Sequence, residues 1–378
     1  MRFLHIADLH LGKQLAGYSL LEDQDYILKE ILQIAGREKA EGVLIAGDVY
    51  DKAVPPADAV ALLDRFLTDL IDKGLKVFLI SGNHDNAQRV SFGSNVMKKA
   101  EVYISPVFSG LPEKITLEDG HGELNIYLMP YIRPAVVKAC YETEEVHGYE
   151  DAFAMVLDHM REEGVLKKEE RNVLIAHQFI TGASISESEE FTAGGMENIS
   201  AELLEDFDYV ALGHIHRAQR VGRDTVRYSG TPLKYSFAEA DHKKSVTIVD
   251  VKEKGEVEIK EVPLVPMRDL KILRGTYNEV TDRSFYQDLK QDDYYRIVLT
   301  DEEEILQAVA KLRTIYPNLM QVDYENTRTR HNAAIESRED LRKKEPMDFM
   351  QELFALQNNQ EMTDEQIAYA RNVLEDVK

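Results

Sequence analysis

Apolar runs alternate with amphipathic patterns through the first 83 residues of the chain. Residues 2–8, 42–48 and 76–83 are short, mostly apolar runs that predict buried strands. Between them, residues 25–39 and 57–74 place apolar side chains three and four positions apart, which is the spacing of one helix face. This order predicts a β-α-β-α-β start and therefore an α/β fold.

Further apolar runs extend the predicted sheet as far as residue 262 and become more hairpin-like toward that end. A helix is predicted at residues 149–164. Pro263 and Pro266 then interrupt the pattern, so we place a domain boundary near residue 268. The additional strands are predicted at residues 124–130, 171–178, 207–214, 244–251 and 256–262.

The pattern predicts four segments along the chain. Residues 1–268 form the large α/β domain, and residues 269–325 form a small α/β module without a candidate chemical cluster. Residues 326–345 have almost no large apolar side chains and predict a linker or a solvated helix. Residues 346–378 predict a helix-loop-helix, whose second helix begins with a capping box between Thr363 and Gln366.

Both predicted tail helices carry an apolar stripe. Their lengths are close to the ~12–15 residues at which isolated helices are marginal in water, so each stripe needs a surface to cover it. That surface is either the core of this chain or another protein, and the polar segment before the helices favours another protein. The stripes are Phe349, Met350, Leu353, Phe354 and Leu356 in the first helix, and Ile367, Ala370, Leu374 and Val377 in the second.

Composition and charge narrow the class of protein. The 378-residue chain is 44% hydrophobic and 30% charged, and no apolar run approaches the roughly 18 residues of a membrane helix. Because Cys140 is the only cysteine and no signal-peptide pattern is present, we expect a cytoplasmic protein without an internal disulfide. The net charge of −23 opposes nucleic-acid binding through phosphate contacts, unless bound divalent cations reverse its sign locally.

Polar side chains that can bind metal follow five of the predicted strands. Open α/β sheets bind their ligands beyond the carboxyl ends of the strands, so side chains in these positions can meet. In an extended chain, residues i and i+2 face the same side, which would pair Asp8 with His10 and His214 with His216. The full set is Asp8, His10, Asp48, Asp51, Asn83, His84, His177, His214 and His216.

The ligand types in this set indicate a two-metal site. Carboxylate, imidazole and amide oxygen without thiolate suit Mn(II), Fe(II) or Zn(II), and about seven ligands exceed what one ion needs. Two ions that share an aspartate would generate hydroxide and hold a phosphoryl group, which is the chemistry of phosphoester hydrolysis. Each fragment alone has an ordinary explanation, since "GD" and "GN" are common turns and His177 could be a core histidine.

The order of these fragments resembles a known family. D-x-H, G-D-x-x-D, G-N-H-D, a lone histidine and G-H-x-H occur at residues 8–10, 47–51, 82–85, 177 and 213–216. This series is similar to that of the calcineurin-like metallophosphoesterase superfamily, which implies a β-sandwich flanked by helices. The segments "YLMPYIRP", "YSGTPLKYSF" and "HKKSV" are similar to bacterial nuclease subunits of this superfamily. The resemblance is strong to about residue 262 and looser beyond it.

The resemblance implies a role for each site residue. It assigns one ion to Asp8, His10 and His216, the other to Asn83, His177 and His214, and the bridging position to Asp48. It makes His84 the histidine that protonates the leaving oxygen, and it makes Asp51 the residue that orients His84. Asp85 is expected to cap its loop rather than to orient His84.

The resemblance also implies an activity and partners. It implies a metal-dependent DNA nuclease, most consistent with Mn(II), that acts on duplex ends, hairpins and single strands in DNA repair, recombination and replication. The implied partners are DNA and an SMC-like ATPase, with a homodimer formed through residues 57–70 and 89–97 and a heterotetramer with the ATPase. A phosphatase or phosphodiesterase for small substrates, and a DNA-end scaffold, are the alternatives.

Overall fold

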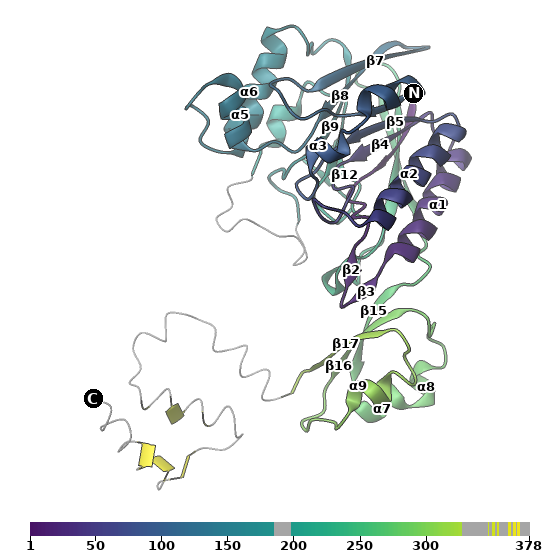
Figure 1. The fold of residues 1–378 in the computed structure, drawn as a ribbon, viewed down its shortest axis with the longest axis vertical. Coiled ribbons are helices and arrows are strands. Elements are labelled where there is room, and N and C mark those ends of the chain that lie inside the picture. Colours follow the sequence, from purple (N-terminus) through teal and green to yellow (C-terminus); the bar gives the residue numbers. More distant parts are fainter. Residues whose placement is uncertain are drawn as a thin grey trace. The chain divides into compact units, whose positions relative to one another are not determined.

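The computed structural model describes residues 1–184 and 198–326, together with residues 347, 350, 351, 354, 362, 363, 366, 367, 369 and 370. The chain divides into two compact units, Met1–Asp269 and Leu270–Lys378 (Figure 1). We describe each unit by itself.

Two six-stranded sheets form the first unit. The first has the order β14-β13-β1-β4-β5-β6. Strands β1, β4, β5 and β6 run parallel, and β13 pairs antiparallel with both of its neighbours, β1 and β14. A parallel sheet buried on both faces needs apolar side chains in consecutive positions, and all five residues of β4 are buried. The strands are β1 (Arg2–Ile6), β4 (Gly42–Ala46), β5 (Lys76–Ile80), β6 (Val102–Ile104), β13 (Ser245–Val251) and β14 (Val257–Pro263).

The second sheet has the order β11-β12-β10-β9-β8-β7. Its central strands β8, β9, β10 and β12 are parallel, and β7 and β11 close the two edges as antiparallel strands. The sequence pattern did not predict β7, β11 or β12, because these strands are short or partly exposed. The strands are β7 (Glu113–Asp119), β8 (Gly122–Met129), β9 (Arg171–His177), β10 (Tyr209–Gly213), β11 (Gln219–Val221) and β12 (Arg223–Tyr228).

The sheets pack face to face, and helices cover their outer faces. Phe3, Phe78 and Val249 of the first sheet join Ile126 and Ile175 of the second in one buried cluster. Helices α1 (Leu21–Arg37) and α2 (Ala57–Asp72) lie side by side along the first sheet, and α5 (Pro134–Tyr141) and α6 (Tyr149–Glu162) lie against the second (Figure 1). The predicted β-sandwich flanked by helices is confirmed.

Short elements complete the first unit. The strands β2 (Gln14–Leu15) and β3 (Tyr18–Ser19) form a small hairpin after β1. The helices α3 (Ala87–Val90) and α4 (Ser94–Met97) follow β5, and the 3₁₀ turns are η1 (Lys98–Ala100), η2 (Ala201–Leu204) and η3 (Phe237–Glu239).

A three-stranded parallel sheet forms the described part of the second unit up to residue 326. Strands β15 (Leu270–Gly275), β16 (Tyr294–Leu299) and β17 (Leu319–Tyr324) are accompanied by α7 (Tyr277–Thr281), α8 (Arg283–Tyr286) and α9 (Ala308–Leu312). Tyr295, Leu312 and Tyr316 lie in its core. Helix α9 begins directly after Gln307, whose backbone is left-handed with φ 57°.

The described residues of the tail contain the predicted capping box. The Thr363 amide donates to Oε1 of Gln366 at 2.9 Å, and the Gln366 amide donates to Oγ1 of Thr363 at 3.4 Å. Met350, Phe354, Tyr369 and Ala370 line one shared cavity. The predicted linker residues 327–345 and Phe349, Leu353, Leu356, Leu374 and Val377 lie outside the described residues.

Candidate metal centre

The candidate ligands come from the carboxyl ends of five strands: His177 is the last residue of β9, and the others lie in loops that follow β1, β4, β5 and β10. Within each sheet these strands are parallel neighbours, so their carboxyl ends lie at one edge. Two contacts join the edges of the two sheets. Nδ1 of His177 lies 2.8 Å from the carbonyl oxygen of Ala46, and the His214 amide donates to the Asp8 carboxylate at 3.0 Å. The site therefore lies where the carboxyl ends of both sheets meet.

The prediction that Asp8 with His10, and His214 with His216, lie in extended strands is wrong. Strand β1 ends at Ile6 and β10 at Gly213, so the ligands lie in the loops beyond. Asp8, His10 and His214 have positive φ values of 53°, 43° and 103°. A left-handed backbone is unfavourable for these residue types, and surrounding contacts must hold it in place. Asn83 and His84 likewise lie in a turn after β5 rather than in a strand.

Ligand atoms in the described residues form three overlapping groups. In each group the atoms lie within 4.8 Å of one another, and the groups are Asp8, His10 and His216; Asp8, Asp48 and His177; and His10, Asp48 and His84. Asp48 belongs to two of them, since its Oδ2 lies 3.7 Å from Nε2 of His10 and 3.4 Å from Nε2 of His177.

Asn83 joins the remaining histidine, His214, to the cluster through a contact that it shares with His177. Its Oδ1 lies 2.9 Å from Nε2 of His177 and 3.0 Å from Nδ1 of His214. Asp48 fixes the loop that carries Asn83, because its Oδ1 accepts the His84 amide at 2.9 Å. All seven residues that the sequence nominated as ligands therefore meet in one cluster.

The cluster fits divalent metal ions. His10 is buried, yet neither of its ring nitrogens has a hydrogen-bond partner among the residues that the structure describes. A buried polar atom without a partner costs about 1–3 kcal/mol, and coordination to a metal removes that cost. The donors are carboxylate, imidazole and amide oxygens without a thiolate, which suits Mn(II), Fe(II) or Zn(II).

Burial and mutual attraction shift the pKa values of the ligands. Burial raises the pKa of Asp8 to about 7, although His177 opposes the shift. For His177, burial lowers the pKa, but attraction and hydrogen bonding to Asp48 outweigh it and raise the pKa to about 9. Burial and the neighbouring His177 lower the pKa of His214 to about 3. These pKa values imply that, without metal, His177 carries a proton at neutral pH and Asp8 takes one up as the pH falls through about 7.

Asp51 contacts His84 through its backbone carbonyl. An orienting contact from the Asp51 carboxylate was expected and is replaced by this one. Nδ1 of His84 lies 3.1 Å from the carbonyl oxygen of Asp51. The Asp51 carboxylate instead pairs with Lys13 at 2.8 Å. Asp85 caps its loop as expected, since its carboxylate accepts the amides of Val49, Tyr50 and Gly82 at 2.9–3.0 Å.

Two buried residues that the sequence analysis did not nominate hold the loop at Leu9 and His10. Nε2 of Gln24 donates to the His10 carbonyl at 2.8 Å and to the Leu9 carbonyl at 3.2 Å. The Tyr235 hydroxyl also donates to the Leu9 carbonyl and lies 3.1 Å from Nε2 of Gln24. Nothing in the sequence marked Gln24 as a site residue, because it lies within an amphipathic helix. Tyr235 could have been found, since it lies in the segment "YSGTPLKYSF" that carries the family resemblance.

Three glycines let the backbone approach the ligands. A Cβ at Gly82 would lie 2.1 Å from Oδ1 of Asp48, and one at Gly47 would lie 2.4 Å from Nδ1 of His177. A Cβ at Gly213 would lie 1.9 Å from the Ala46 carbonyl oxygen. Gly47 also has φ +87°, which favours glycine. The glycines of "GD", "GN" and "GH" are thus required by the site and are not ordinary turn residues.

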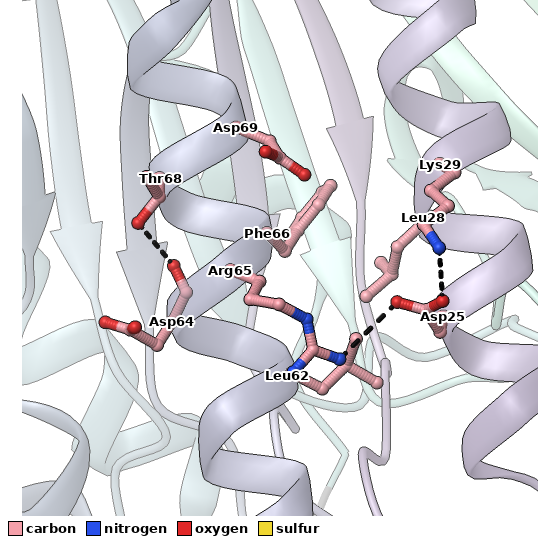
Figure 2. A pocket seen from close by; sticks show the side chains of 9 residues that line it. All are labelled: Asp25, Leu28, Lys29, Leu62, Asp64, Arg65, Phe66, Thr68 and Asp69. Atoms are coloured by element: carbon pink, nitrogen blue, oxygen red, sulfur yellow. Dashed lines mark hydrogen bonds and ion pairs between the residues drawn. The ribbon is translucent and has the colours of Figure 1, made fainter.

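A groove between α1 and α2 is separate from the metal-ligand cluster. It has a volume of about 370 Å³, and none of its lining residues belongs to the cluster. Asp25 pairs there with Lys29 at 2.5 Å and with Arg65 at 3.5 Å (Figure 2). Because the groove shares no residue with the metal-ligand cluster, and its basic side chains Lys29 and Arg65 already pair with Asp25, we assign it no part in the site.

Comparisons with known proteins identify the family of this chain. The family model for calcineurin-like phosphoesterases matches residues 1–218. A relative from Staphylococcus epidermidis, the D subunit of the nuclease SbcCD, is 31% identical over 322 residues, which are 85% of this chain and 84% of the relative. The chain belongs to the SbcD family of calcineurin-like phosphoesterases. Members of this SbcD family are metal-dependent phosphodiesterases, and the cluster described above supplies the donors for divalent metal.

One further comparison concerns the residues after the phosphoesterase match, and two others concern the fold alone. The model of the type 5 capsule protein repressor C-terminal domain matches residues 266–358. A dimetal phosphatase from Danio rerio has a TM-score of 0.41 and 12% identity, covering 71% of this chain and 98% of the phosphatase. TT1561 of Thermus thermophilus has a TM-score of 0.40 and 12% identity, covering 69% of this chain and 98% of that protein. Among the described residues, no helix has the length and apolar character needed to cross a membrane.

The glycine geometry predicts that Gly82→Ala removes metal while the fold remains. The new methyl group would displace Asp48, whereas Gly120→Ala is a matched control because nothing lies within 4 Å of the added carbon. Metal content and thermal unfolding should be measured for both variants. Normal metal content in folded Gly82→Ala would contradict this geometry.

The pKa shifts predict that metal affinity rises with pH. A metal ion must displace the protons of Asp8 and His177, whose pKa values of about 7 and about 9 lie above those of ordinary groups. We expect the apparent affinity for Mn(II) to fall by roughly tenfold or more per pH unit as the pH decreases below about 7. Calorimetric titration in two buffers of different ionisation enthalpy counts the released protons, and an affinity independent of pH would contradict the prediction.

Proposed function

We propose that this protein is a Mn(II)-dependent DNA nuclease subunit with exonuclease activity on duplex ends and endonuclease activity on hairpins and single strands. It would act in the cytoplasm with an SbcC-type SMC-like ATPase in DNA repair, recombination and replication. One observation carries the proposal: six candidate metal ligands gather with buried Asp48 in one cluster, in a chain of the SbcD family. Manganese fits the oxygen and imidazole donors, and two ions account for the number of donors.

The two ions would be held on either side of Asp48. The bridging role is supported by the distances from its Oδ2, which lies 3.7 Å from Nε2 of His10 and 3.4 Å from Nε2 of His177. We assign Asp8, His10 and His216 to one ion and Asn83, His177 and His214 to the other, with Asp48 shared. When bound, such a pair of ions supplies a hydroxide nucleophile and stabilises charge on the phosphoryl oxygens.

His84 would be the general acid. Its side chain is 31% exposed, unlike that of His10 at 1%, so it can reach a DNA strand at the mouth of the cluster. The Asp51 carbonyl accepts from Nδ1, which directs Nε2 toward the cluster. Protonated His84 would donate its Nε2 proton to the leaving oxygen as the phosphodiester bond breaks. Asp51 supports catalysis in this scheme by positioning His84 through its main chain.

The rest of the chain would serve assembly. We propose residues 1–268 as the nuclease domain, 269–325 as a capping domain, 326–345 as a linker and 346–378 as a helix-loop-helix that binds the ATPase. A homodimer through α2 and residues 89–97 is supported by Phe92 and Val96, whose side chains are exposed by 83% and 72%. Two subunits with two ATPase chains would form the heterotetramer.

Substitution of a ligand and of the acid should have different effects. Asp48→Asn should lose metal and activity together, because a bridging charge is removed. His84→Gln should keep both ions and lose turnover by about 10²–10⁴-fold, since only proton transfer is removed. Metal analysis and Mn(II)-dependent cleavage of hairpin DNA measure both effects. Full metal occupancy in Asp48→Asn would contradict the assignment.

Assembly can be separated from catalysis by two variants. Phe92→Asp with Val96→Asp should convert a dimer to a monomer in light scattering, because it places charges in the proposed interface.

Deletion of residues 346–378 should keep the dimer and Mn(II)-dependent cleavage of single strands while abolishing ATPase binding and ATP-stimulated cleavage of duplex ends. A truncated protein that still captures the ATPase with full affinity would refute the assignment of the tail.

A further inference from the structure

A buried carboxylate lies directly behind His216. Oε1 of Glu239 is 2.9 Å from Nδ1 of His216, and the Glu239 side chain is 0% exposed. Because the carboxylate can only accept, Nδ1 of His216 donates to it. The hydrogen of the neutral ring is then on Nδ1, and the Nε2 lone pair remains for the cluster formed with Asp8 and His10.

Lys244 holds both Glu239 and His216. Its buried Nζ donates to Oε2 of Glu239 at 2.6 Å, to Oγ1 of Thr231 at 2.6 Å and to the His216 carbonyl at 2.9 Å. Oε2 of Glu239 also faces the Thr231 hydroxyl at 3.3 Å and the Tyr235 amide at 3.4 Å. The lysine thus fixes the backbone of His216 and the partner of its ring with one ammonium group.

The local fold places Glu239 in this position. Residues Phe237–Glu239 form η3, which begins at Ser236, and the Glu239 amide donates to the Ser236 carbonyl at 3.0 Å. The neighbouring segments "YSGTPLKYSF" and "HKKSV" supply Thr231, Tyr235 and Lys244. These segments carry none of the proposed metal ligands, so orientation of His216 gives them a role in the site.

We propose that Glu239 is a positioning residue that sets the tautomer and ring orientation of His216 for metal binding, and that Lys244 keeps the carboxylate in place. The inference rests on the proposed role of His216 as a ligand. Residues that hydrogen-bond to a metal-binding histidine commonly change metal affinity by 10- to 100-fold when they are replaced. One ion, the one assigned to Asp8, His10 and His216, should depend on Glu239.

Glu239→Gln tests the proposal with almost no change of shape. An amide has one oxygen, whereas Glu239 accepts donors at both of its oxygens. If the amide nitrogen faces Lys244, two donors oppose each other. If it faces His216, Nδ1 must accept, and the hydrogen moves to Nε2, where it blocks the metal. We expect Mn(II) affinity at one of the two sites to fall by roughly 10- to 100-fold while the other changes by less than about twofold.

A double variant distinguishes orientation from general support of the fold. In Glu239→Gln/Lys244→Met, the amide nitrogen can face the position left by the ammonium group, and its oxygen can again accept from His216. Affinity for the weakened ion should therefore recover by about tenfold relative to Glu239→Gln. The exposed pair of Lys252 and Glu258, 2.5 Å apart, provides matched controls as Glu258→Gln and Glu258→Gln/Lys252→Met, which should bind as wild type.

The measurements are calorimetric Mn(II) titration, thermal unfolding of the metal-free protein, and nitrogen-15 NMR of the His216 tautomer in the metal-free protein. Folded Glu239→Gln that binds both ions as wild type with Nδ1 of His216 still protonated would overturn the proposal, as would unfolding of both Glu239 variants. His216→Ala distinguishes an error in the proposed ligand set from an error in the proposed role of Glu239. If it keeps both ions, the proposed ligand set fails; if it loses one ion while Glu239→Gln loses none, only the inference fails.

Discussion

The burial of two neighbouring carboxylates, Asp8 and Asp48, is the constraint on which the surrounding structure depends, because their negative charge must be compensated. Both lie within the same group of ligand atoms, and both are excluded from solvent. Buried like charges are unfavourable by several kcal/mol unless positive charge or hydrogen-bond donors compensate them. The His214 and His84 amides donate to them, and the imidazoles of His10 and His177 lie beside Asp48. Divalent ions complete this compensation and give the cluster its chemistry.

The same requirement explains why the site lies at the meeting edge of two sheets. Parallel strands place their carboxyl ends together, which brings the ends of five strands and the loops after four of them to one location. The loops approach so closely that Gly47, Gly82 and Gly213 leave no room for a side chain. Left-handed backbone at Asp8 and Asp48 turns the carboxylates inward. Sheet order, glycine positions and backbone conformation therefore all serve the placement of a few polar atoms.

The sequence pattern predicted the buried helices and strands of the first unit well and its loops poorly. Strands β4 and β9 are buried throughout and contain the apolar runs "VLIA", which indicated strands, whereas β11 has three residues and β7 alternates in burial. The ligand set was visible because polar residues follow apolar runs. Its backbone geometry was not visible, since φ at His10 depends on contacts made by distant Gln24 and Tyr235. Glu239 was missed for the same reason, as 23 residues separate it from His216.

The central claim is that Asp48 is shared between two metal ions. Anomalous diffraction from crystals of the full chain soaked in Mn(II) tests it directly, because each bound manganese gives its own peak. The account predicts two peaks about 3.5–4 Å apart, one beside Asp8, His10 and His216 and one beside Asn83, His177 and His214, with the Asp48 carboxylate between them. A single peak at full Mn(II) saturation, or two peaks without Asp48 between them, would contradict it.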